Sequence, residues 1–140
     1  MLTETETIRQ ILASCRTVAV VGLSPRPERA SHEVAHYLQV HGWRIIPVNP
    51  VAASSGATIL GEPVYATLQE AAQHASIDVV DVFRNSEDVP PVAQEAIAIG
   101  ARALWLQLGI ENAPAAAAAQ AAGLSVVQNR CLKVEHAANA

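Results

Sequence analysis

The basic residues of this chain are unevenly distributed, and their positions suggest a chemistry. Five of the nine Lys and Arg residues follow apolar runs: Arg26, Arg29, Arg84, Arg130 and Lys133. A guanidinium group binds phosphate through two parallel N–H···O hydrogen bonds, and an ammonium group adds a point charge. Because the formal net charge is −4 at pH 7, these cations do not belong to a general excess of basic residues. The pattern predicts a site for a phosphate-bearing ligand.

Acidic residues in the same segments leave a second interpretation open. Glu28, Glu87 and Asp88 lie beside the basic residues in the sequence and would neutralise part of their charge. Under this interpretation the cations are solvated surface charges, which contribute little to stability and bind nothing. The concentration of five of the nine cations in loops that follow apolar runs favours the phosphate site.

The segment "VAVVGLSPRPERASHEV", residues 18–34, begins as a nucleotide-binding segment does but lacks the usual glycines. Four apolar residues lead into Gly22, as a buried strand leads into a phosphate-binding turn. The P-loop pattern is absent, which argues against an ordinary P-loop NTPase, and the Rossmann fingerprint GxGxxG is absent too. We expect backbone N–H groups near Ser24, and a helix capped by Ser31, to bind phosphate. Prolines in the loop would lower the entropy lost on binding.

The end of "WRIIPVNP", residues 43–50, narrows the choice of ligand. NAD sites place Asp or Glu at the end of the second strand, where the carboxylate accepts hydrogen bonds from the ribose. The corresponding residue here is Asn49, which carries no charge. Loss of that carboxylate suits a ligand with a phosphate on its ribose. Coenzyme A (CoA) and NADP both meet this condition, and the residues do not choose between them.

Apolar segments alternate with helical segments along the whole chain. Strands are predicted over 17–22, 43–50, 77–83, 103–108 and 124–129. Helices are predicted over 4–14, 31–42, 67–74, 88–100 and 112–123, with a loop over 51–67 that contains one short extended piece. Parallel strands with helical crossovers form right-handed βαβ units. We therefore expect a single domain over residues 1–140, with an N-terminal helix within 1–14. Its fold class is α/β, a Rossmann-like, doubly wound, mainly parallel sheet in three layers.

In such a sheet, ligands bind beyond the carboxyl ends of the strands, and the five cations named above fall in the loops at that edge. Asp81 lies inside an apolar strand, so we expect it to cap a loop or to meet an arginine, a functional role being the alternative. Cys131 is predicted to be a small buried hydrophobe, with reaction at its thiol as the alternative. The five histidines show no spacing typical of a metal site.

Composition excludes several classes of protein. Apolar residues make up 51% and charged residues 16%, as in globular rather than disordered chains. No apolar run approaches the ~20 residues of a membrane span, so we expect no membrane partner. The net negative charge argues against general binding to nucleic acid. The first ten residues are polar and do not form a signal peptide, so we expect a cytoplasmic protein with reduced thiols.

Several blocks of sequence, in order, resemble the small bacterial CoA-binding proteins, a family similar to the CoA-binding domain of the succinyl-CoA synthetase α subunit. The blocks are "VAVVGLSPRPERASHEVAHYL", "WRIIPVNP", "ILGEPVYATL", "IDVVDVFRNSEDVP", "EAIAIGARALWLQLGI" and "AAGLSVVQNRCLKVEH". The resemblance runs from about residue 10 to residue 136. It implies a Rossmann-like domain that binds coenzyme A at the carboxyl edge of its sheet.

The resemblance also implies a set of site residues. The nucleotide phosphates would be held by the first loop: Gly22, Ser24, Pro25 and Arg26, with Arg29 as a further candidate. The adenosine end would be lined by Asn49 and Pro50. The crevice would be completed by Phe83 and Arg84 on one side and by Asn129, Arg130 and Cys131 near the last strand. Of the cations, we expect Arg26 to contribute most to phosphate binding.

The resemblance implies binding of CoA or an acyl-CoA by a non-catalytic carrier, sensor or regulatory module. Catalysis in the synthetase also needs a phosphohistidine domain and a nucleotide-grasp partner, and neither is recognisable in these residues. One alternative is an orphan subunit of an acyl-CoA ligase or transferase that acts with a partner chain. Another is an NADP-dependent oxidoreductase, against which the missing glycines count. No catalytic residue is expected in this chain alone.

Overall fold

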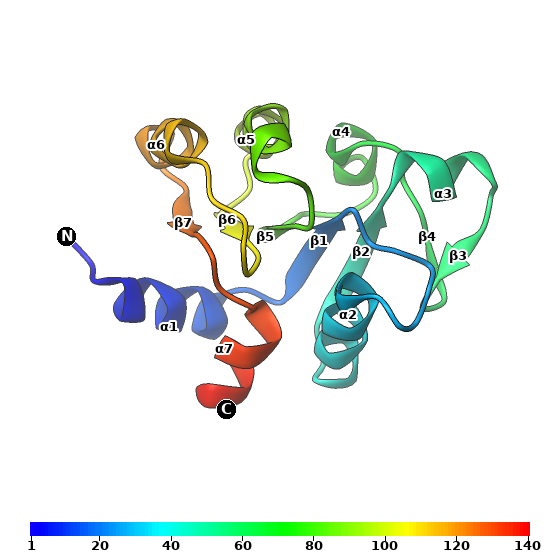
Figure 1. Ribbon diagram of the computed structural model, residues 1–140, viewed down its shortest axis with the longest axis horizontal. Helices are drawn as coiled ribbons and strands as arrows, with labels where there is room; N and C mark the ends of the chain where they lie inside the picture. Colours follow the sequence, from blue (N-terminus) through cyan, green and yellow to red (C-terminus); the bar gives the residue numbers. More distant parts are fainter.

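The computed structural model describes all residues from 1 to 140, and its centre is a five-stranded parallel sheet (Figure 1). The strands lie in the spatial order β2-β1-β5-β6-β7. Their bounds are β1 Thr17–Val21, β2 Arg44–Val48, β5 Val79–Val82, β6 Ala103–Leu106 and β7 Ser125–Val127. All four pairings are parallel. The predicted doubly wound, Rossmann-like α/β fold is therefore confirmed.

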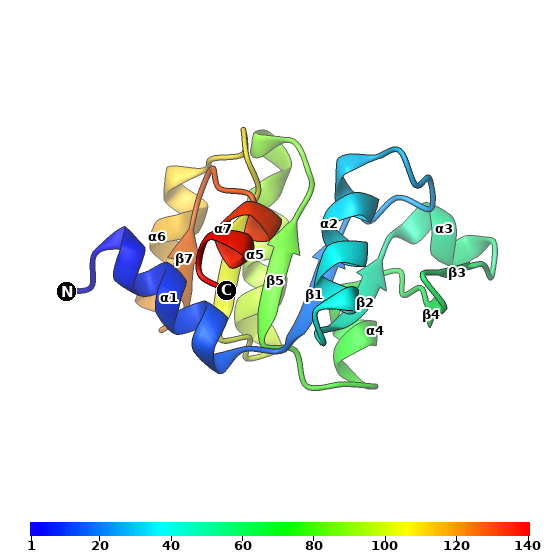
Figure 2. The same ribbon diagram turned by 90° about the horizontal axis from the view of Figure 1, so that it is seen from below.

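Helices cover both faces of the sheet, which gives three layers (Figure 1). One face carries α1 Glu4–Ser14, α2 Ala30–Val40 and α7 Leu132–Ala138, and Figure 2 shows these helices in front of the strands. The opposite face carries α4 Leu68–Ala72, α5 Val89–Ala98, which follows the 3₁₀ turn η1 Ser86–Asp88, and α6 Ala113–Ala121. No helix is long and apolar enough to span a bilayer.

The strands form because their residues are apolar toward both helical layers. In β1, Val18 and Val20 pack into the core under α1, α2 and α7, whereas Ala19 and Val21 pack into the core under α4, α5 and α6. Trp105 of β6 is completely buried in the first of these cores. The predicted alternation of strands and helices follows from this double burial.

The strand order places a topological switch point between β1 and β5. From β1 the chain crosses to β2 on one side, and it later returns to β5 on the other side. The loops that follow β1 and β5 therefore leave the sheet in opposite directions and open a crevice at its carboxyl edge. Most of the predicted ligand-binding residues follow one of these two strands.

Two local predictions were wrong. Residues 51–67 are not a simple loop, because they contain α3 Pro50–Ser54 and the short hairpin β3 Thr58–Ile59 and β4 Glu62–Pro63. Asn49 caps α3 by accepting N–H groups from its first turn. The cap of α2 was also misplaced: the N-cap residue is Arg29, and Ser31 lies within the first turn of the helix.

Candidate functional site

The crevice at the switch point contains a cleft of about 310 Å³, here called the Arg29 cleft. Its lining residues are Gly22, Ser24, Arg26, Arg29, Ala30, Ser31 and Phe83. Two cations and the first turn of α2 face this cleft, and no acidic residue lines it. Sequence reasoning placed six of these seven residues in the site, and only Ala30 is new.

Gly22 shapes the Arg29 cleft through its backbone. Its φ of +89° lies in the left-handed region, and a Cβ atom at this position would stand 2.3 Å from the carbonyl oxygen of Phe83. Its N–H donates to the carbonyl of Val48, at 2.8 Å. That N–H is therefore not free for a phosphate, and Gly22 instead allows the ends of β1 and β5 to approach closely.

The loop after β1 is folded by its own hydrogen bonds. The Ser24 N–H donates to Oγ of Ser31 at 3.0 Å, and the Arg26 N–H donates to Oγ of Ser24 at 3.1 Å. The predicted phosphate donors near Ser24 are thus occupied, which corrects that part of the prediction. The first N–H groups of α2, at Ala30 and its neighbours, have no acceptor within the helix. These groups supply the free donors at the cleft.

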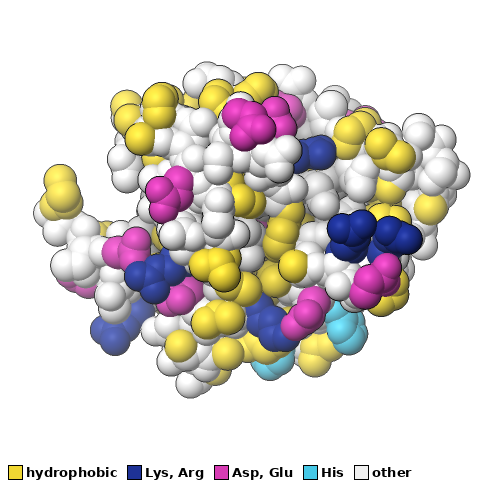
Figure 3. All heavy atoms as spheres, viewed as in Figure 1, with side chains coloured by type: hydrophobic (Ala, Val, Ile, Leu, Met, Phe, Trp, Pro, Cys, Tyr) yellow, Lys and Arg dark blue, Asp and Glu magenta, His cyan; other side chains and the backbone are white.

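Most of the five predicted cations pair with acidic side chains. Arg26 lies 3.4 Å from Glu28, with both side chains about two-thirds exposed. Lys133 donates to Glu33 at 2.7 Å, and the Arg130 guanidinium contacts two further glutamates. Arg29 and Arg84 take part in no ion pair. Figure 3 shows basic side chains in separate groups, most of them beside acidic ones.

The Asn49 side chain holds the first loop in place. Its Nδ2 group donates to the carbonyl of Leu23 at 2.9 Å, while its Oδ1 accepts N–H groups from Val51 and Ala52. Both ends of the amide are engaged, so Asn49 positions the loop that carries Arg26. Pro50 follows as the first residue of α3 and is exposed.

Phe83 also lines a second hollow along the edge, here called the Arg84 hollow. Its lining residues are Phe83, Arg84, Asn85, Ser86, Glu87, Gly109 and Ile110. The Arg29 cleft and the Arg84 hollow thus share one wall, formed by the end of β5. Arg26 and Arg84, predicted to line a common crevice, lie in these two neighbouring hollows, which share Phe83 as a lining residue.

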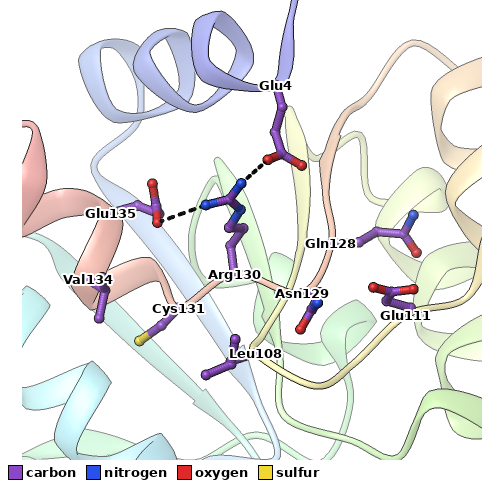
Figure 4. Close-up of a pocket in the computed structure, with 9 residues that line it drawn as sticks. All are labelled: Glu4, Leu108, Glu111, Gln128, Asn129, Arg130, Cys131, Val134 and Glu135. Carbon is purple, nitrogen blue, oxygen red and sulfur yellow. Dashed lines mark hydrogen bonds and ion pairs between the residues drawn. The ribbon is translucent and has the colours of Figure 1, made fainter.

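The remaining predicted residues gather in a third hollow, the Cys131 pocket (Figure 4). Its lining residues are Glu4, Leu108, Glu111, Gln128, Asn129, Arg130, Cys131, Val134 and Glu135. Asn129 has a φ of 57°, and its Oδ1 accepts the N–H of Gly109. The Trp105 indole donates to the carbonyl of Arg130 at 2.8 Å and fixes this segment over β6. Cys131 is half-buried there.

Asp81 does not cap a loop or meet an arginine, contrary to the prediction. It lies in β5 between Val20 and Trp105, and its side chain is fully buried. Neither carboxylate oxygen has a hydrogen-bond partner. Burial raises the pKa of the Asp81 carboxyl well above its usual range, because the apolar core disfavours the charged form.

Comparison with known proteins assigns the chain to a family. The model of the CoA binding domain matches residues 16–137. The chain belongs to this family. A relative in Bacillus subtilis (strain 168), the uncharacterized protein YneT, is 40% identical over 93% of this chain and 92% of its own length. A hypothetical protein from Pyrococcus horikoshii OT3 superposes with a TM-score of 0.88 and 36% identity, covering 98% of this chain and 92% of that one.

The same fold also occurs in distant proteins that bind another nucleotide. RSP, a Rex-family repressor solved in complex with β-NADH, is 18% identical with a TM-score of 0.56, over 75% of this chain and 52% of that one. At this identity the likeness extends to the fold alone. The family model is therefore the finding that bears on the ligand.

Proposed function

We propose that this chain binds CoA or an acyl-CoA at the carboxyl edge of its sheet, and that it serves as a non-catalytic carrier, sensor or regulatory module. The observation that carries the proposal is the Arg29 cleft. It combines Arg26, Arg29 and the free N–H groups of α2 at the switch point, in a chain of the CoA binding domain family. These groups suit the diphosphate of a nucleotide, because both the guanidinium groups and a helix N-terminus attract anions.

The arrangement around the cleft also suits the ribose phosphate of CoA. Arg29 pairs with no acid and makes no capping hydrogen bond, so its guanidinium is available to a phosphate oxygen. The residue after β2 is Asn49, and no carboxylate there would repel a charged ribose. In the proposed complex the adenosine lies toward Asn49 and Pro50, and the pantetheine arm leaves past Phe83.

The cleft offers anchoring groups and no reactive side chain. Its lining contains no carboxylate, histidine or thiol that could serve as a base or nucleophile. Binding without chemistry is therefore the function that its residues support best. A fold of this type hosts many activities, so the site and not the fold decides the proposal.

Calorimetric titration with CoA, dephospho-CoA and NADP tests the choice of ligand. We expect micromolar binding of CoA and weaker binding of dephospho-CoA, which lacks the 3′-phosphate. Since hydrogen bonds to charged groups contribute roughly 1.5–3 kcal/mol, the loss should be about tenfold or more. Binding of NADP without binding of CoA would overturn the assignment.

A pair of arginine variants tests the location of the site. Arg29→Gln should weaken CoA binding roughly tenfold or more, because it removes the cation without an acidic partner. Arg44→Gln is the matched control, since Arg44 is exposed at the amino end of β2, on the opposite edge of the sheet. Equal affinities for the two variants would place the ligand elsewhere.

A further inference from the structure

The Cys131 pocket has an apolar side that no part of the chain covers. Leu108 and Val134 line it with 70% and 58% of their surfaces exposed, although large aliphatic residues are usually buried. In Figure 4 these two side chains lie on either side of Cys131. Burial of this surface by a ligand would be favourable.

The other side of the Cys131 pocket is acidic. Arg130 is its only cation, and the guanidinium contacts both Glu4 and Glu135 (Figure 4). Glu111 takes part in no ion pair. One arginine and three glutamates are among the lining residues, so the formal charge of the pocket is −2. A negatively charged ligand group would be repelled here.

The pocket lies along the same edge as the Arg29 cleft. The Arg29 cleft lies at the end of β1 and the Cys131 pocket at the ends of β6 and β7, and the strands follow in the order β1-β5-β6-β7. Three strand spacings of ~4.8 Å, about 14 Å in all, therefore separate the end of β1 from the end of β7. This span is comparable with an extended pantetheine arm. Phe83 lines both the Arg29 cleft and the Arg84 hollow. Leu108 of the Cys131 pocket is followed directly by Gly109 and Ile110, which line the Arg84 hollow.

We propose that the Cys131 pocket receives the acyl group of a bound acyl-CoA and selects for uncharged, apolar acyl chains. The inference rests on the proposed function, because the Arg29 cleft must hold the nucleotide for the arm to reach this pocket. Leu108 and Val134 contact the hydrocarbon, and Glu111 with its acidic neighbours rejects an acyl group that ends in a carboxylate. Butyryl-CoA is preferred over succinyl-CoA.

Titration with CoA, butyryl-CoA and succinyl-CoA tests the selection. Butyryl-CoA should bind roughly three- to tenfold more tightly than CoA, because each partly buried methylene adds to affinity. Succinyl-CoA should bind more weakly than CoA. Succinyl-CoA binding as tightly as butyryl-CoA would overturn the inference while leaving the proposed function intact. Failure of all three ligands to bind would instead refute the proposed function, and the inference with it.

Two variants assign the selectivity to named residues. Leu108→Ser should abolish the preference for butyryl-CoA over CoA, and Glu111→Gln should reduce the discrimination against succinyl-CoA. Both should bind CoA as the wild type does, which also shows that they are folded. An unchanged butyryl preference in Leu108→Ser contradicts the proposal. So does self-association of the wild type that Leu108→Ser abolishes, because the apolar pair would then be a contact between copies of the chain.

Discussion

At the scale of single residues, Gly22 is the position at which the end of β1 approaches the end of β5, beside the Arg29 cleft. Gly22→Ala should lower the free energy of unfolding by roughly 2–5 kcal/mol, because a left-handed backbone and a close contact add their costs. The contact is the 2.3 Å approach of a Cβ atom to the Phe83 carbonyl oxygen. Urea unfolding measures the loss.

Gly109 provides the matched control for this effect. Its φ is +86°, close to that of Gly22, but a Cβ atom there would meet nothing within 4 Å. Gly109→Ala should therefore cost only the backbone strain, about 1–2 kcal/mol. Equal losses for the two variants would mean that the approach of Phe83 does not require glycine.

Asp81 gives the fold a pH dependence of its own. Because burial raises the pKa of this carboxyl above its value in the unfolded chain, the folded state holds the proton more tightly. Its contribution to stability is complete below the unfolded pKa and is lost as pH rises through the folded pKa. Asp81→Asn, which cannot ionise, should lack this loss. Urea unfolding from about pH 4 to about pH 8 should show the free energy of unfolding of the variant rising relative to that of the wild type.

The control for Asp81 is Asp78 at the start of the same apolar segment. Its Oδ2 accepts the backbone N–H groups of Arg16 and Thr17, at 2.9 and 3.1 Å. Asp78→Asn should lower stability by weakening these hydrogen bonds. Its stability should still decrease with rising pH, as that of the wild type does. If Asp81→Asn keeps that decrease as well, Asp81 is not the group that titrates.

At the scale of elements, two helix starts that look alike in sequence differ in the structure. Asn112 caps α6 by accepting the N–H of Ala115 at 3.0 Å, and it also donates to the carbonyl of Ser86. Asp88 holds the N-cap position of α5, but its side chain makes no capping bond. Asn112→Ala should cost about 1–2 kcal/mol of unfolding free energy, and Asp88→Ala at most ~0.5 kcal/mol. Thermal unfolding of both variants distinguishes these roles, and equal losses would contradict them.

The long elements could be predicted from sequence because local pattern and burial agree. The apolar run at residues 17–22 forms a strand, and the helices predicted over 67–74 and 112–123 form, with Thr67 and Asn112 as their N-caps. The five-residue helix α3 was missed, although Asn49 followed by Pro50 is a typical N-cap and first helical residue. Its small residues favoured a loop instead.

The site was harder to predict than the fold, because its charges are set by distant residues. Arg130 pairs with Glu4, which lies 126 positions away in sequence. Spacing in the sequence gives no indication of such a pair, so Arg130 looked like a free cation. The loop residues that fill the Arg29 cleft were predictable, since parallel topology fixes the edge at which they lie.

At the scale of the whole molecule, an acidic chain must attract an anionic ligand to one edge. The Arg29 cleft is solvent-exposed, so salt screens its attraction for phosphate. Affinity for CoA should therefore fall as ionic strength rises, despite the net charge of −4. Calorimetric titration at low and high salt measures this effect. An affinity that rises with salt would mean that repulsion by the acidic surface dominates.

A second basic hollow exists on the opposite, amino edge and is the natural competitor for an anionic ligand. Arg9, Arg16 and His136 line it, and its lining includes no Asp or Glu side chain. A ¹⁵N NMR titration with CoA therefore tests the central claim most directly. The account predicts the largest shifts at the backbone amides of Ala30 and Phe83. Shifts concentrated around the hollow of Arg9 and Arg16, with the carboxyl edge unchanged, would contradict it.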